Sequence, residues 1–387
     1  MDSIISEKLY GIAKQGSTLL GIGPMSKNCV DATIELSNQY DAPLFLIASR
    51  RQIEASQLGG GYTNNWSTEE FANYVRNNDK KGNVILARDH GGPWQNSSDV
   101  EKKFDLNKAM DSAKKSYETD IESGFQFIHI DPSEDIFSSL TIDKIFERIF
   151  ELYEFCYEIA KKKNKQIFFE VSIGKDSDNP HTFEEVEYIF SKLTNFCKQN
   201  NYPYPFFLAI RIGTYVMEAR NIGDFESLIK TENHSVRKIL ISKVIDLCNQ
   251  HKIMMKHHNT DYLSDEALKL HPKLGIHSAN VAPEFGVIET RSFLNLLEKN
   301  GLNSEVEQFI DIAYNSMKWK KWMLSNNNLE KKEKAIIAGH YVFSNPEFLE
   351  LKRIVQTKLT KIENIDDYLK KDVKRGILRY LTTFNLI

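Results

Sequence analysis

The chain has 387 residues, of which 41% are hydrophobic and 27% are charged, and this composition is typical of a folded protein with a large apolar core. Its formal net charge is −3 and no basic stripe is interleaved with aromatic residues, which argues against a nucleic-acid-binding surface. No run approaches the roughly 18 apolar residues that a membrane span requires, and the first residues do not resemble a signal peptide, so we expect a cytoplasmic protein without membrane contact.

Eight short apolar or β-branched runs recur along the chain, and stretches with helical periodicity lie between them. The predicted strands are 18–23, 43–49, 83–89, 125–131, 166–171, 205–212, 252–257 and 274–278. The intervening helices are clearest at 30–40, 69–77, 106–123, 142–163, 183–199, 236–249 and 284–299. This alternation predicts parallel strands, because a parallel strand can return only through a crossover.

Eight such units favour a closed (β/α)8 TIM barrel over residues 1–303. The alternative is an open doubly wound sheet, but no GxGxxG fingerprint follows the first strand. From 304 to 387 only helical periodicity is present, so we expect a helical extension packed on the barrel. We interpret its aromatic residues as packing residues rather than as a ligand cage; they are Trp319, Trp322, Tyr341 and Phe343.

The four cysteines fall within the helical stretches and form no CxxC pair; they are Cys29, Cys156, Cys197 and Cys248. This spacing favours small, buried apolar side chains and agrees with a reducing environment.

Catalytic groups of a TIM barrel lie at the C-terminal ends of its strands, and ionisable residues stand at this end of six consecutive predicted strands. They are Asp89 and His90, His129 and Asp131, Glu170, Arg211, His257 to Asp261, and His277 to Asn280. Charged groups are rarely buried without partners, so this pattern predicts a metal, a substrate or mutual pairing.

His90, Glu170 and His258 come from three different strands and are predicted to converge on one divalent cation. Two imidazoles, one carboxylate and an open position suit Zn²⁺, which can polarise a carbonyl. Asp89 is the predicted acid/base for a substrate hydroxyl, and Asp131 is a second predicted catalytic carboxylate. Each of these residues could instead be a hydrogen-bonded residue of the barrel mouth. For His129, His257 and His277, that structural role is at least as well supported.

Several groups around the same mouth could bind the substrate. Gly60 and Gly61 could hold an anion on backbone N–H groups, or could belong to a flexible loop only. Arg50, Arg51, Arg88 and Arg211 are candidate partners of a phosphate or a carboxylate, or else members of internal ion pairs. The other predicted substrate contacts are His129, Asn259, Asp261, Ser278 and Asn280.

At these residues the sequence resembles the accessory, non-catalytic subunit family of class II D-tagatose-1,6-bisphosphate aldolase. The matching segments occur in the family's order and are 57–63 (QLGGGYT), 89–93 (DHGGP), 124–133 (GFQFIHIDPS), 170–174 (EVSIG), 258–262 (HNTDY), 281–283 (VAP) and 339–341 (GHY) followed by Pro346. The resemblance implies a TIM barrel related to the metal-dependent class II aldolases. It also implies that Asp89 is the acid/base and that His90, Glu170 and His258 approach the metal. Some relatives are described as 4-epimerases of sugars or sugar phosphates.

Two segments depart from the family pattern. Strand two usually ends in Glu-Ala, where this chain has Ile47-Ala48 followed by Arg50 and Arg51. Lys-Val-Gly-Pro usually follows strand eight, where this chain has Asn280 to Pro283. The missing lysine removes the usual phosphate partner, which the arginines could replace unless the substrate differs.

Two functions follow as alternatives. The first is a divalent-metal-dependent aldolase or epimerase acting on a ketose or ketose phosphate, working alone or as a homo-oligomer. The second is a non-catalytic subunit that stabilises a separate class II tagatose-bisphosphate aldolase. The acidic and histidine residues at the strand ends favour the enzyme, because a scaffold does not need them. A sugar-phosphate kinase finds no support, since the chain has no GxxxxGK[ST] loop.

Overall fold

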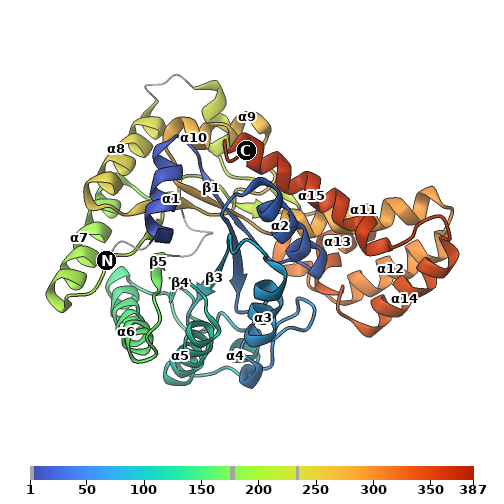
Figure 1. Cartoon of the computed structure of the whole chain (residues 1–387), viewed down its shortest axis with the longest axis horizontal. Helices are drawn as coiled ribbons and strands as arrows, with labels where there is room; N and C mark the ends of the chain where they lie inside the picture. The colour runs from blue at the N-terminus through green and yellow to red at the C-terminus, as the bar shows by residue number, and fades with distance from the viewer. Residues whose placement is uncertain (1–3, 175–178, 232–234) are drawn as a thin grey trace.

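Eight parallel strands close into a barrel in the computed structural model, which describes residues 4–174, 179–231 and 235–387 (Figure 1). Around the barrel the order is β1-β10-β9-β6-β5-β4-β3-β2, so that the first and last strands pair with each other. The strands are β1 (Leu19–Ile22), β2 (Leu44–Ser49), β3 (Val84–Gly91), β4 (Phe127–Ile130), β5 (Phe168–Val171), β6 (Phe207–Ala209), β9 (Met254–His257) and β10 (Ser278–Val281). The predicted (β/α)8 barrel is confirmed, and the open sheet is excluded.

The seven predicted helices are all present and surround the strands. They are α2 (Lys27–Tyr40), α3 (Thr68–Asn78), α5 (Leu106–Ser123), α6 (Ile142–Lys162), α7 (Phe183–Asn200), α8 (Val236–His251) and α11 (Pro283–Lys299). Side-chain caps mark the start of five of these seven helices, α8 and α11 being the exceptions. Ser67 and Thr182 form capping boxes with the glutamates three residues later, which satisfies free N–H groups of the first turn. The four cysteines are buried in α2, α6, α7 and α8, as predicted.

Shorter elements that the periodicity did not predict complete the barrel. They are α1 (Ile4–Lys14), α4 (Ser97–Glu101), α9 (Asp265–Leu268), α10 (Leu270–Leu274) and the antiparallel pair β7 (Val216–Met217) and β8 (Arg220–Asn221). The eighth strand also lies later than predicted. Residues 270–274 are helical, Gly275 ends that helix with a φ of 77°, and the strand begins only at Ser278. A short apolar run does not by itself distinguish a helix from a strand, and here the run before Gly275 is helical.

The interior of the barrel is apolar at one end and polar at the other. Phe45, Phe127, Phe207 and Met254 point inward at the N-terminal end and pack with Leu9 of α1. Two residues further along, β4 and β9 present the polar His129 and Lys256, whereas β2 and β6 present Ile47 and Ala209. Asp89, Glu170 and Asn280 add polar groups from β3, β5 and β10. Since alternate residues of a strand face the same side, the strands themselves deliver a polar layer to the C-terminal mouth.

The predicted helical extension is confirmed and projects to one side of the barrel (Figure 1). It contains α12 (Asn303–Asn315), η3 (Lys320–Trp322), α13 (Lys331–Ala338), η4 (Gly339–Tyr341), α14 (Pro346–Lys358) and α15 (Ile365–Thr383). Phe293 of α11, Phe309 and Phe348 pack edge to face at the centre of its apolar cluster. The end of α15 returns to the barrel, where Ile377 and Tyr380 join the main core. Among the described helices, none combines the length and the apolar run that crossing a bilayer would require.

Candidate metal and substrate site

Four buried side chains converge at the mouth of the barrel. They are Asp89 of β3, His129 of β4, Glu170 of β5 and His258, which directly follows β9. Each offers one ligand atom, and these atoms all lie within 4.8 Å of one another. Two imidazoles and two carboxylates form a donor set that suits Zn²⁺ and other divalent cations.

Hydrogen bonds hold these four side chains in place. His258 Nε2 lies 2.9 Å from Oε1 of Glu170, and His129 Nδ1 lies 3.3 Å from Oδ1 of Asp89. The backbone N–H of His90 lies 3.0 Å from the same His129 Nδ1, so this nitrogen either accepts that N–H or, when it is protonated, donates to Asp89. The other ring nitrogen of His129, Nε2, is buried and has no hydrogen-bond partner among the described residues. A buried polar atom without a partner is costly, so this nitrogen is consistent with a site that receives a ligand.

Both carboxylates of the cluster are ionised in spite of their burial. Burial alone would raise the pKa of Asp89, but the neighbouring His90, His129 and His258 outweigh it and lower that pKa to about 2. For Glu170 burial is again the largest single effect, and Lys256 and the two histidines outweigh it, so its pKa falls well below the usual range. The cluster therefore offers two anionic ligands at neutral pH, as a divalent cation requires.

The cluster shares Glu170 and His258 with the predicted metal trio. It contains His129 in place of His90, and it adds Asp89, which the sequence predicted as an acid/base rather than as a ligand. The position of His90 has a local cause: β3 is irregular between Arg88 and Gly91, and His90 has a φ of 44°. Its ring borders the cluster, with Nε2 3.7 Å from Oδ2 of Asp89 and the ring centroid 5.3 Å from those of His129 and His258. His90 Nδ1 lies 2.8 Å from Asp131 Oδ2, and its side chain keeps 29% of its surface exposed.

A cavity of about 330 Å³ opens at the barrel mouth, and Asp89 is the member of the cluster that lines it. Its floor includes Asp89, His90, Asp131 and Asn259, all of them predicted site residues. Its walls come from two segments that are distant in sequence: Arg51 and Tyr62 follow β2, while Lys321, Trp322 and Tyr341 belong to the C-terminal extension. The volume is suited to a small polar ligand such as a sugar derivative.

Two of the four aromatic residues predicted to be packing residues therefore line the cavity. Trp322 Nε1 donates to the hydroxyl of Tyr341 at 3.2 Å, and both rings face this space. The other two pack as predicted, since Trp319 stacks on Tyr314 and Phe343 packs on Phe348. Sequence periodicity shows which residues lie on one face of a helix, but it does not show which surface the folded extension covers. For this reason the sequence did not predict that Trp322 and Tyr341 line a cavity.

Arg51 and Lys321 bring positive charge to the cavity wall. The ammonium of Lys321 lies 4.7 Å from the centre of the Trp322 ring and 5.2 Å from that of Tyr341. Neither Arg51 nor Lys321 forms an ion pair with a carboxylate in the part of the chain that the structure describes. Both side chains are thus available to a ligand anion.

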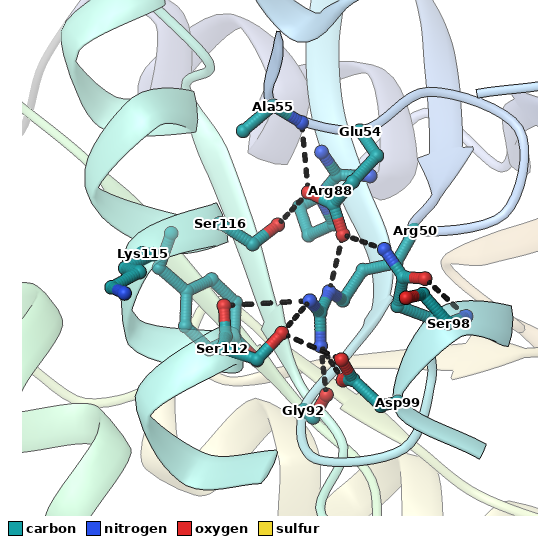
Figure 2. Close-up of polar contacts among 12 residues, drawn as sticks. Arg50, Glu54, Ala55, Arg88, Gly92, Ser98, Asp99, Ser112, Lys115 and Ser116 are labelled. Atoms are coloured by element: carbon teal, nitrogen blue, oxygen red, sulfur yellow. Dashed lines mark hydrogen bonds and ion pairs between the residues drawn. The ribbon is translucent and has the colours of Figure 1, made fainter. Parts of the chain in front are cut away.

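Arg50 is fully buried among polar partners, whereas its neighbour Arg51 is exposed (Figure 2). Its guanidinium donates to Glu54 at 2.7 Å, to Asp99 at 3.2 Å, and to the carbonyl of Gly92 at 2.8 Å. Of the two roles considered for this arginine, the structure supports the internal ion pair. Arg88 is likewise paired inside the protein, with Asp120 at 2.6 Å.

Gly60 and Gly61 do not offer their N–H groups to an anion. The N–H of Gly60 donates to the carbonyl of Ala55, and that of Gly61 donates to the carbonyl of Trp66. A Cβ on Gly61 would lie 1.9 Å from the carbonyl oxygen of Gln52, so this glycine permits close passage of two backbone segments.

Two other predicted substrate contacts have structural partners. Arg211 donates to the carbonyls of Ile173 and Asn179, so it joins the segments that follow β5 and β6. Asp261 accepts the N–H groups of Ala282 and Glu284, both at 2.9 Å, and caps α11. Burial, with the nearby Glu284, raises the pKa of Asp261 to about 8.

The remaining predicted residues of β9 and β10 are divided between the site and the interior. Asn280 lies inside the strand rather than after it, and its amide is 3.4 Å from Oδ1 of Asp89, beside the cluster. Ser278 is deeper and fully buried. His257 contacts Thr214 and His271 at 2.8 Å and 3.0 Å, and His277 Nδ1 accepts the N–H of Met255 at 3.0 Å, which are structural roles.

Sequence reasoning missed Lys256, whose ammonium lies 2.5 Å from Oε2 of Glu170. The signal was present as alternation on β9, where Met254, Lys256 and His258 occupy every second position. A lysine in this row must point into the barrel.

Comparison with known proteins gives matches in structure only. No family model matches the chain, and no curated protein matches its sequence. A probable tagatose 6 phosphate kinase from Sinorhizobium meliloti 1021 is 14% identical with a TM-score of 0.73, covering 95% of this chain and 100% of that one. Fructuronate-tagaturonate epimerase from Cohnella laeviribosi is 11% identical with a TM-score of 0.58, covering 95% and 81%. Fructose-bisphosphate aldolase from Campylobacter jejuni is 11% identical with a TM-score of 0.56, covering 99% and 94%. At these identities the likeness establishes a shared TIM-barrel fold.

Proposed function

We propose that this protein is a divalent-metal-dependent aldolase or epimerase that acts on a ketose carrying a negatively charged group. The observation that carries the proposal is the convergence of Asp89, His129, Glu170 and His258 at the C-terminal mouth of the barrel, where Asp89 also lines a cavity. Active sites of TIM-barrel enzymes occupy this face. Two of the solved structures with the same fold are a sugar-phosphate aldolase and a ketose-acid epimerase, and the proposal draws its reaction class from them.

A divalent cation, when bound to these four residues, would polarise a ketone carbonyl and stabilise negative charge on its oxygen. The chain itself supplies groups for proton transfer. The His90 imidazole faces the cavity and is held by the carboxylate of Asp131, an arrangement that orients an acid/base. Gln95 donates to the same oxygen of Asp131 at 3.2 Å and keeps the pair aligned.

The charged end of the substrate would lie against Arg51 and Lys321. Arginine matches the geometry of both phosphate and carboxylate, and an anion between these two cations would gain charge-assisted hydrogen bonds. This cation pair would take the place of the phosphate-binding lysine of the resembling family, at whose position this chain has Asn280, inside β10. The substrate would then reach from the cation pair on the cavity wall to the cluster on its floor.

Metal analysis of the purified chain, followed by a substrate screen, tests the proposal. The screen would contain ketose bisphosphates, ketose monophosphates and keto-uronates, each with Zn²⁺, Co²⁺ or Mn²⁺, and NMR would detect cleavage and epimerisation. We expect turnover of at least one anionic ketose that a chelator abolishes and added metal restores. A chain without metal affinity or turnover, which nevertheless activates a co-expressed class II aldolase, would establish the alternative function, an accessory subunit.

A further inference from the structure

Lys256 is enclosed in the centre of the barrel, with only 1% of its side chain exposed. Its ammonium lies 4.8 Å from the centre of the Phe207 ring and 5.7 Å from that of Phe45, in the layer below the metal-binding cluster. A buried ammonium requires a counter-ion, and Glu170 provides it at 2.5 Å. Lys256 does not line the mouth cavity, which argues against attack of its amine on a substrate carbonyl.

The two carboxylate oxygens of Glu170 have different partners as a result. Oε2 is held by Lys256, whereas Oε1 faces the cluster, 2.9 Å from His258 Nε2 and 3.8 Å from His129 Nδ1. A carboxylate that is tied at one oxygen is restrained from binding a cation through both. The ion pair therefore holds Oε2 of Glu170 in a structural contact and leaves Oε1 as the oxygen that can act as a ligand.

We propose that Lys256 is a positioning residue of the metal site, which restricts Glu170 to one ligand oxygen and lowers the affinity of the site for its cation. The inference rests on the proposed function, since it concerns the same four ligands. Single-oxygen ligation leaves a coordination position for a substrate oxygen, as catalytic metal sites require. The charge of Lys256 offsets one of the two ligand carboxylates, so the site attracts a divalent cation less strongly. The ligands then neutralise less of the charge of the cation, and more of that charge can act on the substrate.

Two substitutions separate the two effects. Lys256→Gln removes the charge but keeps an N–H donor for Oε2 of Glu170, whereas Lys256→Met removes both. The matched control is Lys238→Met, because Lys238 is also buried but lies on α8, where its ammonium donates to the carbonyl of Thr231 at 2.9 Å. Affinity for Zn²⁺ and Co²⁺ would be measured by competition with a chromophoric chelator. The visible absorption of the Co²⁺ form would report the coordination number.

We expect Lys256→Gln and Lys256→Met to bind both ions about tenfold more tightly or better, because removal of a nearby like charge strengthens cation binding. The Co²⁺ absorption should stay the same in Lys256→Gln. It should weaken in Lys256→Met, because the released second oxygen of Glu170 raises the coordination number. Lys238→Met should change neither quantity.

Equal or weaker metal binding by Lys256→Gln would overturn the proposed effect on affinity, and an unchanged Co²⁺ spectrum in Lys256→Met would overturn the restriction of Glu170. If Lys256→Met does not fold, which circular dichroism would reveal, the Lys256→Gln variant still decides the charge effect. A wild-type chain that binds neither ion would refute the metal-dependent function itself. That result is distinct from one in which wild type and variants bind equally.

Discussion

The imidazole of His90 is paired with the carboxylate of Asp131, at 2.8 Å, above a cluster in which the neighbouring Asp89 takes part. Consecutive residues of one strand end thus face different partners. Asp89 points into the group of converging ligands, while His90 lies at the rim with its ring toward the cavity. Under the proposed function, Asp89 would bind the metal and His90 would transfer the proton, and each role can be tested by substitution.

The first prediction concerns which histidines hold the metal. His129→Ala should reduce metal content sharply, because it removes one of four converging ligands. His90→Ala should leave metal content close to that of wild type, since the ring of His90 is outside the cluster. Elemental analysis of both variants after dialysis checks this. Loss of metal in His90→Ala with retention in His129→Ala would support the trio predicted from sequence instead.

The second prediction concerns Asp131. Asp131→Asn removes the charge that orients His90, so turnover of an anionic ketose should fall by about 10²- to 10⁴-fold, the usual effect of losing a positioned acid/base. Metal content and melting temperature should change little, because Asp131 is not a member of the cluster. Asp89→Asn is the contrasting variant and should lose metal as well as activity. Equal turnover by Asp131→Asn and wild type would exclude this pair from the chemistry.

The third prediction concerns the cations of the cavity wall. Lys321→Gln and Arg51→Gln should each raise KM for the anionic ketose by about 10- to 100-fold, because one charge-assisted hydrogen bond contributes about 1.5–3 kcal/mol. Their metal affinity should be unchanged. Lys320→Gln is the control, since Lys320 is adjacent in sequence but does not line the cavity. Steady-state kinetics with a charged ketose and its neutral analogue would show whether the effect requires the anion.

The fourth prediction concerns stability and pH at Glu289 of α11, which is buried away from the cluster. Burial raises its pKa to about 7, although hydrogen bonds from Ser26 and Asn28 act in the opposite direction; Asp366 raises it further and Lys352 lowers it. The folded state therefore keeps a proton that the unfolded chain releases near its ordinary pKa of 4.5. The contribution of Glu289 to the free energy of unfolding is therefore fully present below pH 4.5 and is lost as the pH rises to about 7.

Glu289→Gln should remove this dependence. The wild type should lose on the order of 3 kcal/mol of unfolding free energy between pH 4.5 and pH 7 relative to the variant, as the size of the pKa shift implies. Urea denaturation at several pH values provides the comparison. Parallel curves for the two proteins would show that Glu289 titrates equally in the folded and unfolded chain.

Much of the fold followed from local patterns. Alternating apolar runs and helical periodicity predicted the barrel, and seven helices lie where the periodicity placed them, because each pattern reflects burial of one face of one element. The exception, β10, shows the limit of this reasoning. A short apolar run before Gly275 satisfies either a strand or a helix, and only packing against its neighbours makes it α10.

The polar layer of the site was also present in the sequence, since the inward row of a strand is set by alternation. Glu170 and His258 were predicted to converge because both stand at strand ends, and alternation along β4 and β9 would have added His129 and Lys256. Which of these residues meet in space depends on the closure of the barrel. Closure brings β5 and β9 to the two sides of β6, so that Glu170 contacts both Lys256 and His258.

The wall of the cavity depended entirely on tertiary structure. Arg50 and Arg51 are adjacent and chemically identical, yet the turn after β2 sends the first into a buried ion network and the second to the cavity. Lys321 and Trp322 come from the extension, some 230 residues after Asp89 in the chain. Amphipathic periodicity predicts that a helix buries one face, but the surface against which this face packs depends on the tertiary structure. For this reason the sequence alone did not place these residues at the barrel mouth.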